Sequence, residues 1–139
     1  MASAGPAGYS GTPLAKKLGI TDASRLCPLH APPGYRELLP TLSPGFVFEA
    51  KVNAHTDIVH LFVEHKAVLQ ADLAALRRLM RADAALWVSW PKKASKRPTD
   101  ITEDTIREVA LPLGLVDVKV CAVDEVWSGL KLVLRKALR

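Results

Sequence analysis

Two pairs of neighbouring residues in this chain have side chains suited to chemistry. Glu64 and His65 follow an apolar segment, and a carboxylate beside an imidazole can supply a general base and a general acid. Lys92 and Lys93 follow another apolar segment, and their ammonium groups can hold an anion. Aromatic and acidic residues near the ends of other apolar segments complete the candidates: Tyr35, Trp90, Asp124, Glu125 and Trp127. Together these side chains would form a mixed-charge, aromatic rim.

Alternating strands and helices must bring these residues together. Runs of apolar and β-branched residues predict the following strands: Arg25–His30, Phe46–Val52, Ile58–Val63, Ala85–Trp90, Leu115–Val123 and Leu130–Arg135. Apolar spacings of three and four predict helices over Lys66–Arg81 and Thr102–Leu113, the second capped by Asp100 or by Thr102 itself. Two shorter helices are expected, one between its cap Thr12 and Gly19 and one over Pro33–Leu39.

The last third of the chain indicates the architecture. A helix ends at Gly114, and two strands follow that are joined by the turn Asp124–Gly129. The crossover helix predicts that the first of these strands runs parallel to the strand before the helix, and the short turn then makes the last strand antiparallel. The sequence therefore predicts a three-layer, Rossmann-like α/β fold with a mostly parallel sheet that ends in an antiparallel hairpin. In such sheets ligands bind beyond the carboxyl ends of the strands, which is where the candidate residues are expected.

One connection leaves two alternatives open. Only Asn53–Asp57 joins the second predicted strand to the third, whereas a parallel return normally needs a dozen or more residues. Either these two strands pair in antiparallel fashion, or both are short and the link between them is extended.

Three segments carry a resemblance to a known family: YSGTPLAKKLGI (Tyr9–Ile20), WPKKAS (Trp90–Ser95) and the stretch Thr102–Arg135, which contains VDEVWSGLKLV. With these segments the chain resembles a family of small bacterial proteins known only as a domain of unknown function. The resemblance covers nearly the whole chain after residue 8 and implies no activity.

The chain is more distantly similar to the class I methyltransferase-like fold. That similarity implies a glycine-rich loop for S-adenosylmethionine after the first strand and an acidic residue at the end of the second. Here Pro32 and Pro33 occupy the loop, and a proline has no backbone N–H to donate. Glu49 lies within the second strand and Lys51 is closer to the ribose position. We therefore expect no cofactor.

The expected function is non-catalytic binding of a protein partner or a small ligand at the rim. One alternative is a divergent transferase that uses Glu64 and His65. Another is a nucleic-acid accessory protein that uses the basic loop at 92–97, although the net charge of +5 is otherwise spread along the chain. A purely structural interpretation also accounts for the rim: Lys92 and Lys93 pair with the acids of the hairpin turn, and the tryptophans pack against the sheet edge.

Composition sets further expectations. The 139 residues suit one domain over 9–139 after a disordered leader at 1–8, with no secretory signal and no membrane span. Cys27 and His30 have a metal-like spacing but lack a second pair of ligands, and His60 is expected to be a core histidine. Two widely separated cysteines suit a reducing compartment, so the cytoplasm is the expected location.

Overall fold

The computed structural model describes residues 13–39 and 45–139. A six-stranded mixed sheet has the order β2-β1-β3-β4-β6-β5. Its strands are β1 (Arg25–Leu29), β2 (Val47–Phe48), β3 (Ile58–Phe62), β4 (Ala85–Pro91), β5 (Leu115–Ala122) and β6 (Trp127–Leu134). The α-helices are α1 (Leu14–Leu18), α2 (Lys66–Leu79) and α3 (Glu103–Ala110). The predicted Thr12 cap and the leader lie outside the described residues.

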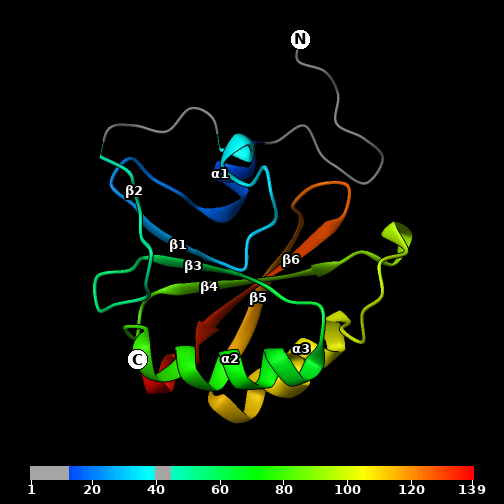
Figure 1. Ribbon diagram of the computed structural model, residues 1–139. Coiled ribbons are helices and arrows are strands. Elements are labelled where there is room, and N and C mark those ends of the chain that lie inside the picture. The colour runs from blue at the N-terminus through cyan, green and yellow to red at the C-terminus, as the bar shows by residue number, and fades with distance from the viewer. Residues whose placement is uncertain (1–12, 40–44) are drawn as a thin grey trace.

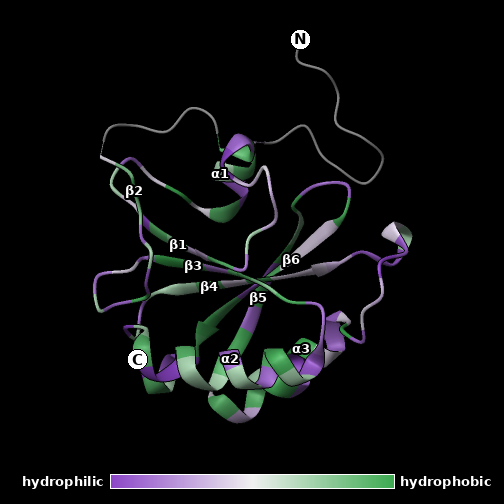
Figure 2. Ribbon diagram, in the orientation of Figure 1, coloured by the Kyte–Doolittle hydropathy of each residue, from purple (hydrophilic) through white to green (hydrophobic). Residues whose placement is uncertain are grey.

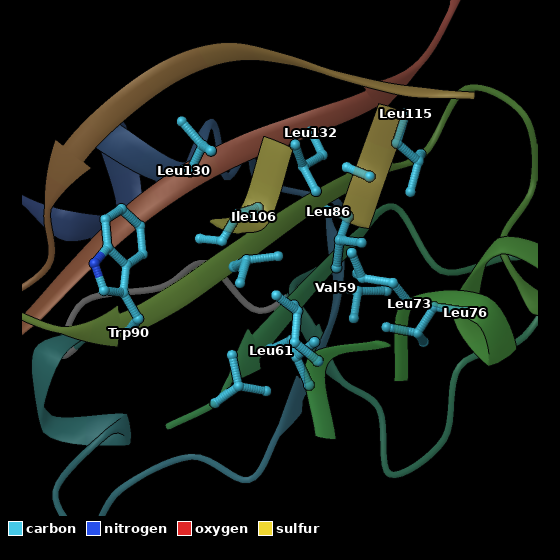
Figure 3. Packing of buried hydrophobic residues seen from close by; sticks show 14 of the residues in the cluster. Val59, Leu61, Leu73, Leu76, Leu86, Trp90, Ile106, Leu115, Leu130 and Leu132 are labelled. Atoms are coloured by element: carbon cyan, nitrogen blue, oxygen red, sulfur yellow. The ribbon is translucent and has the colours of Figure 1, made fainter. Parts of the chain in front are cut away.

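The sheet is the middle of three layers, with α1 on one face and α2 and α3 on the other (Figure 1). Alternate residues of each strand point to opposite faces, so each face has its own core. The core under α2 and α3 includes Val59, Leu61, Leu86 and Leu132, and its packing is shown in Figure 3. The hydropathy pattern in Figure 2 follows the same layering, because the sheet is mostly hydrophobic and α2 alternates between apolar and polar residues.

The strand predicted at Phe46–Val52 is shorter than expected, and a proline in its neighbour gives the reason. Strand β2 pairs in parallel with the start of β1: the Val47 N–H donates to the Ser24 carbonyl and the Glu49 N–H to the Leu26 carbonyl. By the same alternation the backbone of Pro28 faces β2, but proline has no N–H with which to continue the ladder. The pairing stops there, and Pro28 costs β1 no hydrogen bond to β3.

Antiparallel pairing of the second and third strands is wrong, and the link between them is longer than predicted and contains a turn in which the Thr56 N–H donates to the Asn53 carbonyl. Strands β2 and β3 do not pair with each other, because both lie parallel to β1 on its two sides. The link between them is held by Glu49, whose carboxylate accepts hydrogen bonds from Thr56 Oγ1 at 2.6 Å and Asn53 Nδ2 at 3.0 Å and lies 2.8 Å from the Arg25 guanidinium. These contacts let a short link return the chain to the start of β3 without a helix.

The predicted helices are present with shifted ends. Thr102 caps α3 by accepting from the Thr105 N–H, and the final turn, Leu111–Leu113, is a 3-10 helix that ends at Gly114. Asp100 caps a different helix: its carboxylate accepts from the Lys66 N–H at the start of α2. The helix predicted over Pro33–Leu39 is only a 3-10 turn over Arg36–Leu38.

The terminal hairpin has the predicted directions. Strand β6 is antiparallel to both β4 and β5, so β4 and β5 point the same way. However, β6 begins at Trp127 and not at Leu130, because Trp127 pairs with Pro91 and only four residues, 123–126, form the turn. The fold is therefore the expected Rossmann-like α/β fold with a mostly parallel sheet and an antiparallel end. Within the described residues no helix has the length and apolar character needed to span a membrane.

Candidate functional site

A buried hydrogen-bond chain crosses the sheet beneath the carboxyl ends of its strands. Tyr35 Oη lies 2.8 Å from His60 Nδ1, and His60 Nε2 lies 2.7 Å from Ser89 Oγ. His60 and Ser89 are fully buried at the centre of β3 and β4, and Tyr35 is 4% exposed. The loop after β1 brings the tyrosine over the imidazole, and all three side chains lie on the α1 face of the sheet.

Burial keeps the three hydrogen-bonded side chains Tyr35, His60 and Ser89 uncharged. It lowers the pKa of His60 to about 3, because the apolar surroundings disfavour the imidazolium, and it raises the pKa of Tyr35. A neutral imidazole donates from one ring nitrogen and accepts at the other, which the hydroxyls of Tyr35 and Ser89 can both satisfy. His60 is thus a core histidine with both nitrogens bonded, as predicted, and Tyr35 belongs to its packing.

Glu64, at the end of β3, is engaged by a residue from the basic loop. The Arg97 guanidinium donates to Glu64 Oε2 from Nε at 3.2 Å and from Nη2 at 3.1 Å, and it also lies 5.3 Å from the ring centre of Trp127. Thr99 Oγ1 donates to the Glu64 carbonyl at 2.6 Å, which fixes the loop. His65 is exposed at the start of α2, and its pairing with Glu64 as base and acid remains a prediction.

The two tryptophans of the predicted rim lie on opposite faces of the sheet. Trp127 is 5% exposed and packs edge-on against Phe62 at 5.1 Å between ring centres, on the face that carries α1. Trp90 is 8% exposed and belongs to the core under α2 and α3. Both emerge at the same end of the sheet, as expected, but they do not line one common surface.

The charged residues of the rim are distributed around the hairpin turn. Asp124 Oδ1 accepts from the backbone N–H groups of Val126 and Trp127, each at 2.8 Å, so the carboxylate shapes the turn. The Lys92 N–H donates to the Val126 carbonyl, which places the basic loop beside the turn. Lys93 and Glu125 are exposed. The predicted ion pairs between the lysines and the two acids are not tested by these contacts.

A hollow of about 270 Å³ opens beside the loop that follows β1. Its lining comes from the carboxyl end of β1 and the loop that follows it, and the carboxyl ends of the strands are where open α/β sheets bind ligands. Its lining combines apolar residues with one cation and one anion: Pro28, Ala31, Pro32, Gly34, Tyr35, Arg36 and Glu37. The Arg36 guanidinium also lies 3.9 Å from the ring centre of Phe48.

The residues expected to replace a cofactor loop are poorly suited to S-adenosylmethionine. Pro32 and Pro33 supply no N–H groups, and the Glu49 carboxylate is directed to Arg25, Thr56 and Asn53. Burial alone would raise the pKa of Glu49, but its hydrogen bonds and the charge of Arg25 lower it below the ordinary value, so this carboxylate is a charged structural anchor. Among the described residues, no three histidine, cysteine or acidic side chains are grouped as metal ligands.

Several of these contacts have no clear sequence signal. Ser89 is one residue within an apolar strand, and the Arg97 partnership with Glu64 joins residues 33 apart across a loop. Asp72 lies within α2 near His30, although nothing in the local pattern links them. Asp72 lies on the flank of the helix, away from the buried Leu69–Leu73–Leu76 stripe.

Comparison with family models and with curated protein sequences gave no match. Solved structures of similar fold include a protein assigned to the type 11 methyltransferases of Sulfolobus solfataricus, with a TM-score of 0.63 and 10% identity over 88% of this chain and 90% of that one. A LepI variant in complex with SAH and a substrate analogue has a TM-score of 0.53 and 14% identity over 88% of this chain and 39% of LepI. The Bacillus subtilis tRNA methyltransferase TrmK has a TM-score of 0.53 and 10% identity over 87% of this chain and 63% of TrmK.

These likenesses concern the backbone, because the identities of 10–14% are too low to transfer residues. The chain spans most of the first protein and smaller parts of the other two. The order of its strands and its antiparallel end thus give it a methyltransferase-like Rossmann fold.

Proposed function

We propose that this chain is a non-catalytic domain that binds a small ligand at the carboxyl-end rim of its sheet. The observation that carries the proposal is the hollow beside the loop after β1, at the position where this class of sheet binds ligands. The fold likeness adds support, because LepI was solved with SAH. The proposed site comprises the hollow and the predicted rim residues Tyr35, Glu64, His65, Lys92, Lys93, Asp124, Glu125 and Trp127, whereas Trp90 packs on the opposite face of the sheet.

The lining suggests what kind of ligand fits. Arg36 and Glu37 offer one positive and one negative group. Pro28, Ala31 and Pro32 offer apolar contact, and of these three residues only Ala31 has a backbone N–H to donate. A small, largely apolar molecule with a zwitterionic or dipolar group matches this lining better than a polyphosphate does, because a polyphosphate needs several N–H donors or cations. A cytoplasmic location belongs to the same proposal and is supported by the free thiols of Cys27 and Cys121.

Ligand titrations followed by amide NMR test this function. S-adenosylmethionine, SAH, nucleotides, phosphosugars and zwitterionic amino acids form the panel. We expect a zwitterionic or dipolar compound to shift the resonances of residues 28–37 and to raise the unfolding temperature. Ala31→Trp fills the hollow and should abolish the shifts, whereas the control Ala54→Trp lies at an exposed position of the 49–57 link and should retain them. Shifts confined to other surfaces would reject the proposed site.

A methyltransferase-type enzyme is the second candidate, favoured by the fold likeness itself. It would use Glu64 and His65, and it would require Glu64 to leave Arg97 when substrate binds. Calorimetric titration with S-adenosylmethionine distinguishes the two functions. Micromolar affinity that SAH competes would favour the enzyme and would overturn the non-catalytic proposal.

Nucleic-acid binding through the loop at 92–97 is disfavoured by the engagement of Arg97 with Glu64 and Trp127. We expect any binding to be weak and to fall steeply with salt. Nanomolar binding at physiological salt that is lost in Lys92→Ala/Lys93→Ala would instead identify the loop as a nucleic-acid site.

A further inference from the structure

A second and larger cavity, of about 450 Å³, lies on the opposite face of the sheet from α1. One wall is the flank of α2 that carries Asp72, Ala75, Leu76 and Leu79, and the other is formed by Leu29, His30 and the segment 50–52. The link from β2 to β3 contains no helix. Among the described residues, therefore, no helix covers the part of the sheet beside α2. We call this cavity the α2 groove.

The groove is apolar along most of its length. Leu29, Val52 and Leu76 pack at the edge of the core, and Leu79 is 54% exposed at the end of α2. Val68 is 42% exposed, and its spacing from Asp72 and Leu79 places it on the same flank of the helix. An apolar flank of this kind and a cavity of this volume suit a small organic molecule.

One polar pair interrupts the apolar surface. His30 Nε2 lies 3.3 Å from Asp72 Oδ2, and both residues line the groove. The two atoms are close enough for an ion pair, yet Asp72 Oδ2 is buried and has no hydrogen-bond partner within the described chain. The contact thus lacks hydrogen-bond geometry, and the Asp72 side chain, which is 29% exposed, still presents its carboxylate to the groove as an acceptor.

The backbone holds His30 in this position at a cost. Its φ of 57° lies in the left-handed region, which residues other than glycine rarely adopt. Strain of this kind persists where the surrounding structure requires it and occurs frequently at ligand sites. Here it places the imidazole, 61% exposed, at the end of the groove beside Asp72.

The charges around the groove favour an uncharged polar group. Asp72 and Lys51 both line the groove, so a charged head group is attracted by one and repelled by the other, and it also loses hydration on burial. A hydroxyl has no charge to desolvate, and it can donate to the Asp72 carboxylate while its oxygen accepts from the imidazole. We infer that the α2 groove binds an amphipathic alcohol, with its hydroxyl beside His30 and Asp72 and its aliphatic part along Leu76 and Leu79.

Three probes with one tail and different head groups test this inference: 1-octanol, octanoate and octylammonium. Titrations of the full chain are followed by amide and methyl NMR. We expect 1-octanol to shift the signals of Leu76 and Leu79 and to bind about tenfold more tightly than either charged probe, since each charged head group loses its hydration and meets one like charge in the groove. Equal affinity of the three probes, or no shift in the groove, would overturn the inference.

Variants separate the polar pair from the apolar surface. Asp72→Ala should reduce octanol affinity about tenfold, because it removes the carboxylate acceptor. Ala75→Trp should fill the groove and abolish binding, while the matched control Ala67→Trp, at an exposed position outside the groove, should bind as the parent does. Octanol binding that survives both Asp72→Ala and Ala75→Trp would reject the site. If Asp72→Ala does not fold, the head-group series and Ala75→Trp still test whether octanol binds in the groove.

The hollow beside the β1 loop provides an independent control. Pro28 and Ala31 line that hollow, whereas Leu29 and His30 line the α2 groove. Ala31→Trp should therefore leave octanol binding unchanged, so failure of one site is distinguishable from failure of the other. Loss of octanol binding in Ala31→Trp would show that the probe occupies the hollow and would contradict the groove assignment.

Discussion

At the scale of single residues, the carboxyl end of the sheet contains more packing than exposed chemistry. Tyr35, His60, Phe62 and Trp127 form a continuous series of ring contacts, with centres 4.3–5.4 Å apart. The contacts are edge-on except for the stacked pair His60 and Phe62, and ring contacts of both kinds stabilise a core beyond the area they bury. A ligand at the rim would thus lie over a rigid aromatic floor.

Trp127→Ala should destabilise the protein by about 3 kcal/mol or more, because truncating a buried tryptophan loses its packing and leaves a cavity against Phe62. Chemical denaturation measures this change as a lower midpoint. Val118→Ala, at a side chain that is 55% exposed, is the control and should change the free energy of unfolding only slightly. An unaltered midpoint for Trp127→Ala would contradict its assignment to the core.

His60 should make stability depend on pH. Its pKa is about 3 in the folded protein and near 6.5 when the imidazole meets water, so between these values the unfolded chain binds more protons. Stability from this group is fully present above pH 6.5 and is lost as the pH falls toward 3. The expected slope is at most about 1.4 kcal/mol per pH unit for one proton.

Denaturation at several pH values from about 5 to 6.5 measures this slope. The pKa of Glu49 is lowered, so most of its own effect on stability lies at more acid pH and does not interfere. His60→Gln cannot titrate and should flatten the dependence, although it also lowers stability at every pH because the partners of the ring are disturbed. His55→Gln is the matched control, since His55 is exposed. An identical slope in wild type and His60→Gln would show that His60 does not titrate as expected.

At the scale of elements, one loop caps a helix that lies far before it in the sequence. The Asp100 carboxylate accepts from the Lys66 N–H at 2.7 Å and also connects the basic loop to the start of α2. The residue at the normal cap position, His65, provides no side-chain cap. Asp100 therefore performs for α2 what a local cap performs for other helices.

Asp100→Ala should cost about 1 kcal/mol, as removal of a helix cap generally does. Asp100→Asn keeps an acceptor oxygen and should retain most of that stability. Urea denaturation of the two variants makes the comparison. Equal losses in both variants would mean that the negative charge near the helix N-terminus, and not the hydrogen bond, is responsible.

Two helix-ending glycines differ only in their surroundings. Gly19 and Gly114 have φ of 78° and 84°, but an added Cβ at Gly19 meets nothing within 4 Å, whereas at Gly114 it lies 2.5 Å from Leu138 Cδ1. Gly19→Ala should cost about 1–2 kcal/mol for the left-handed backbone. Gly114→Ala should cost more, because Leu138 must also move. Thermal unfolding that ranks Gly19→Ala as the more damaging change would contradict this account.

At the scale of the whole molecule, the sequence predicted the fold better than the site. The directions of β4, β5 and β6 follow from a crossover helix, a glycine stop and a short turn, which are local signals. The shortening of β2 depends on Pro28 in the neighbouring strand, so no pattern within Phe46–Val52 could reveal it. Local sequence determines elements, whereas their pairing partners determine their lengths.

The site was less predictable because it depends on the orientation of side chains. Trp90 and Trp127 were expected on one surface, but the antiparallel pairing of β6 with β4 directs them to opposite faces. Glu64 was a candidate base, yet a loop residue 33 positions away engages it. The α2 groove exists because one connection has no helix, and its polar pair depends on the left-handed backbone of His30.

The position of each strand in the sheet predicts how local stability is distributed. Strand β4 lies between β3 and β6, and its residues Leu86, Trp87 and Val88 are fully buried in the two cores. Strand β2 lies at the edge, spans two residues and is half-buried. Amide hydrogens exchange slowly where opening requires the whole fold to unfold and quickly where a local opening is enough.

Native-state hydrogen exchange should therefore find the slowest amides in β3 and β4, with protection close to the global free energy of unfolding, and much faster exchange in β2. Glu49→Gln tests the reason for the difference, because it weakens the carboxylate contacts to Arg25 and Thr56 that hold the link between β2 and β3. We expect faster exchange in β2 and the 49–57 link with little change in β4. If β2 were as protected as β4, the edge strand would belong to the same cooperative unit as the centre of the sheet, and the short ladder between β1 and β2 would not be the weakest part of the fold.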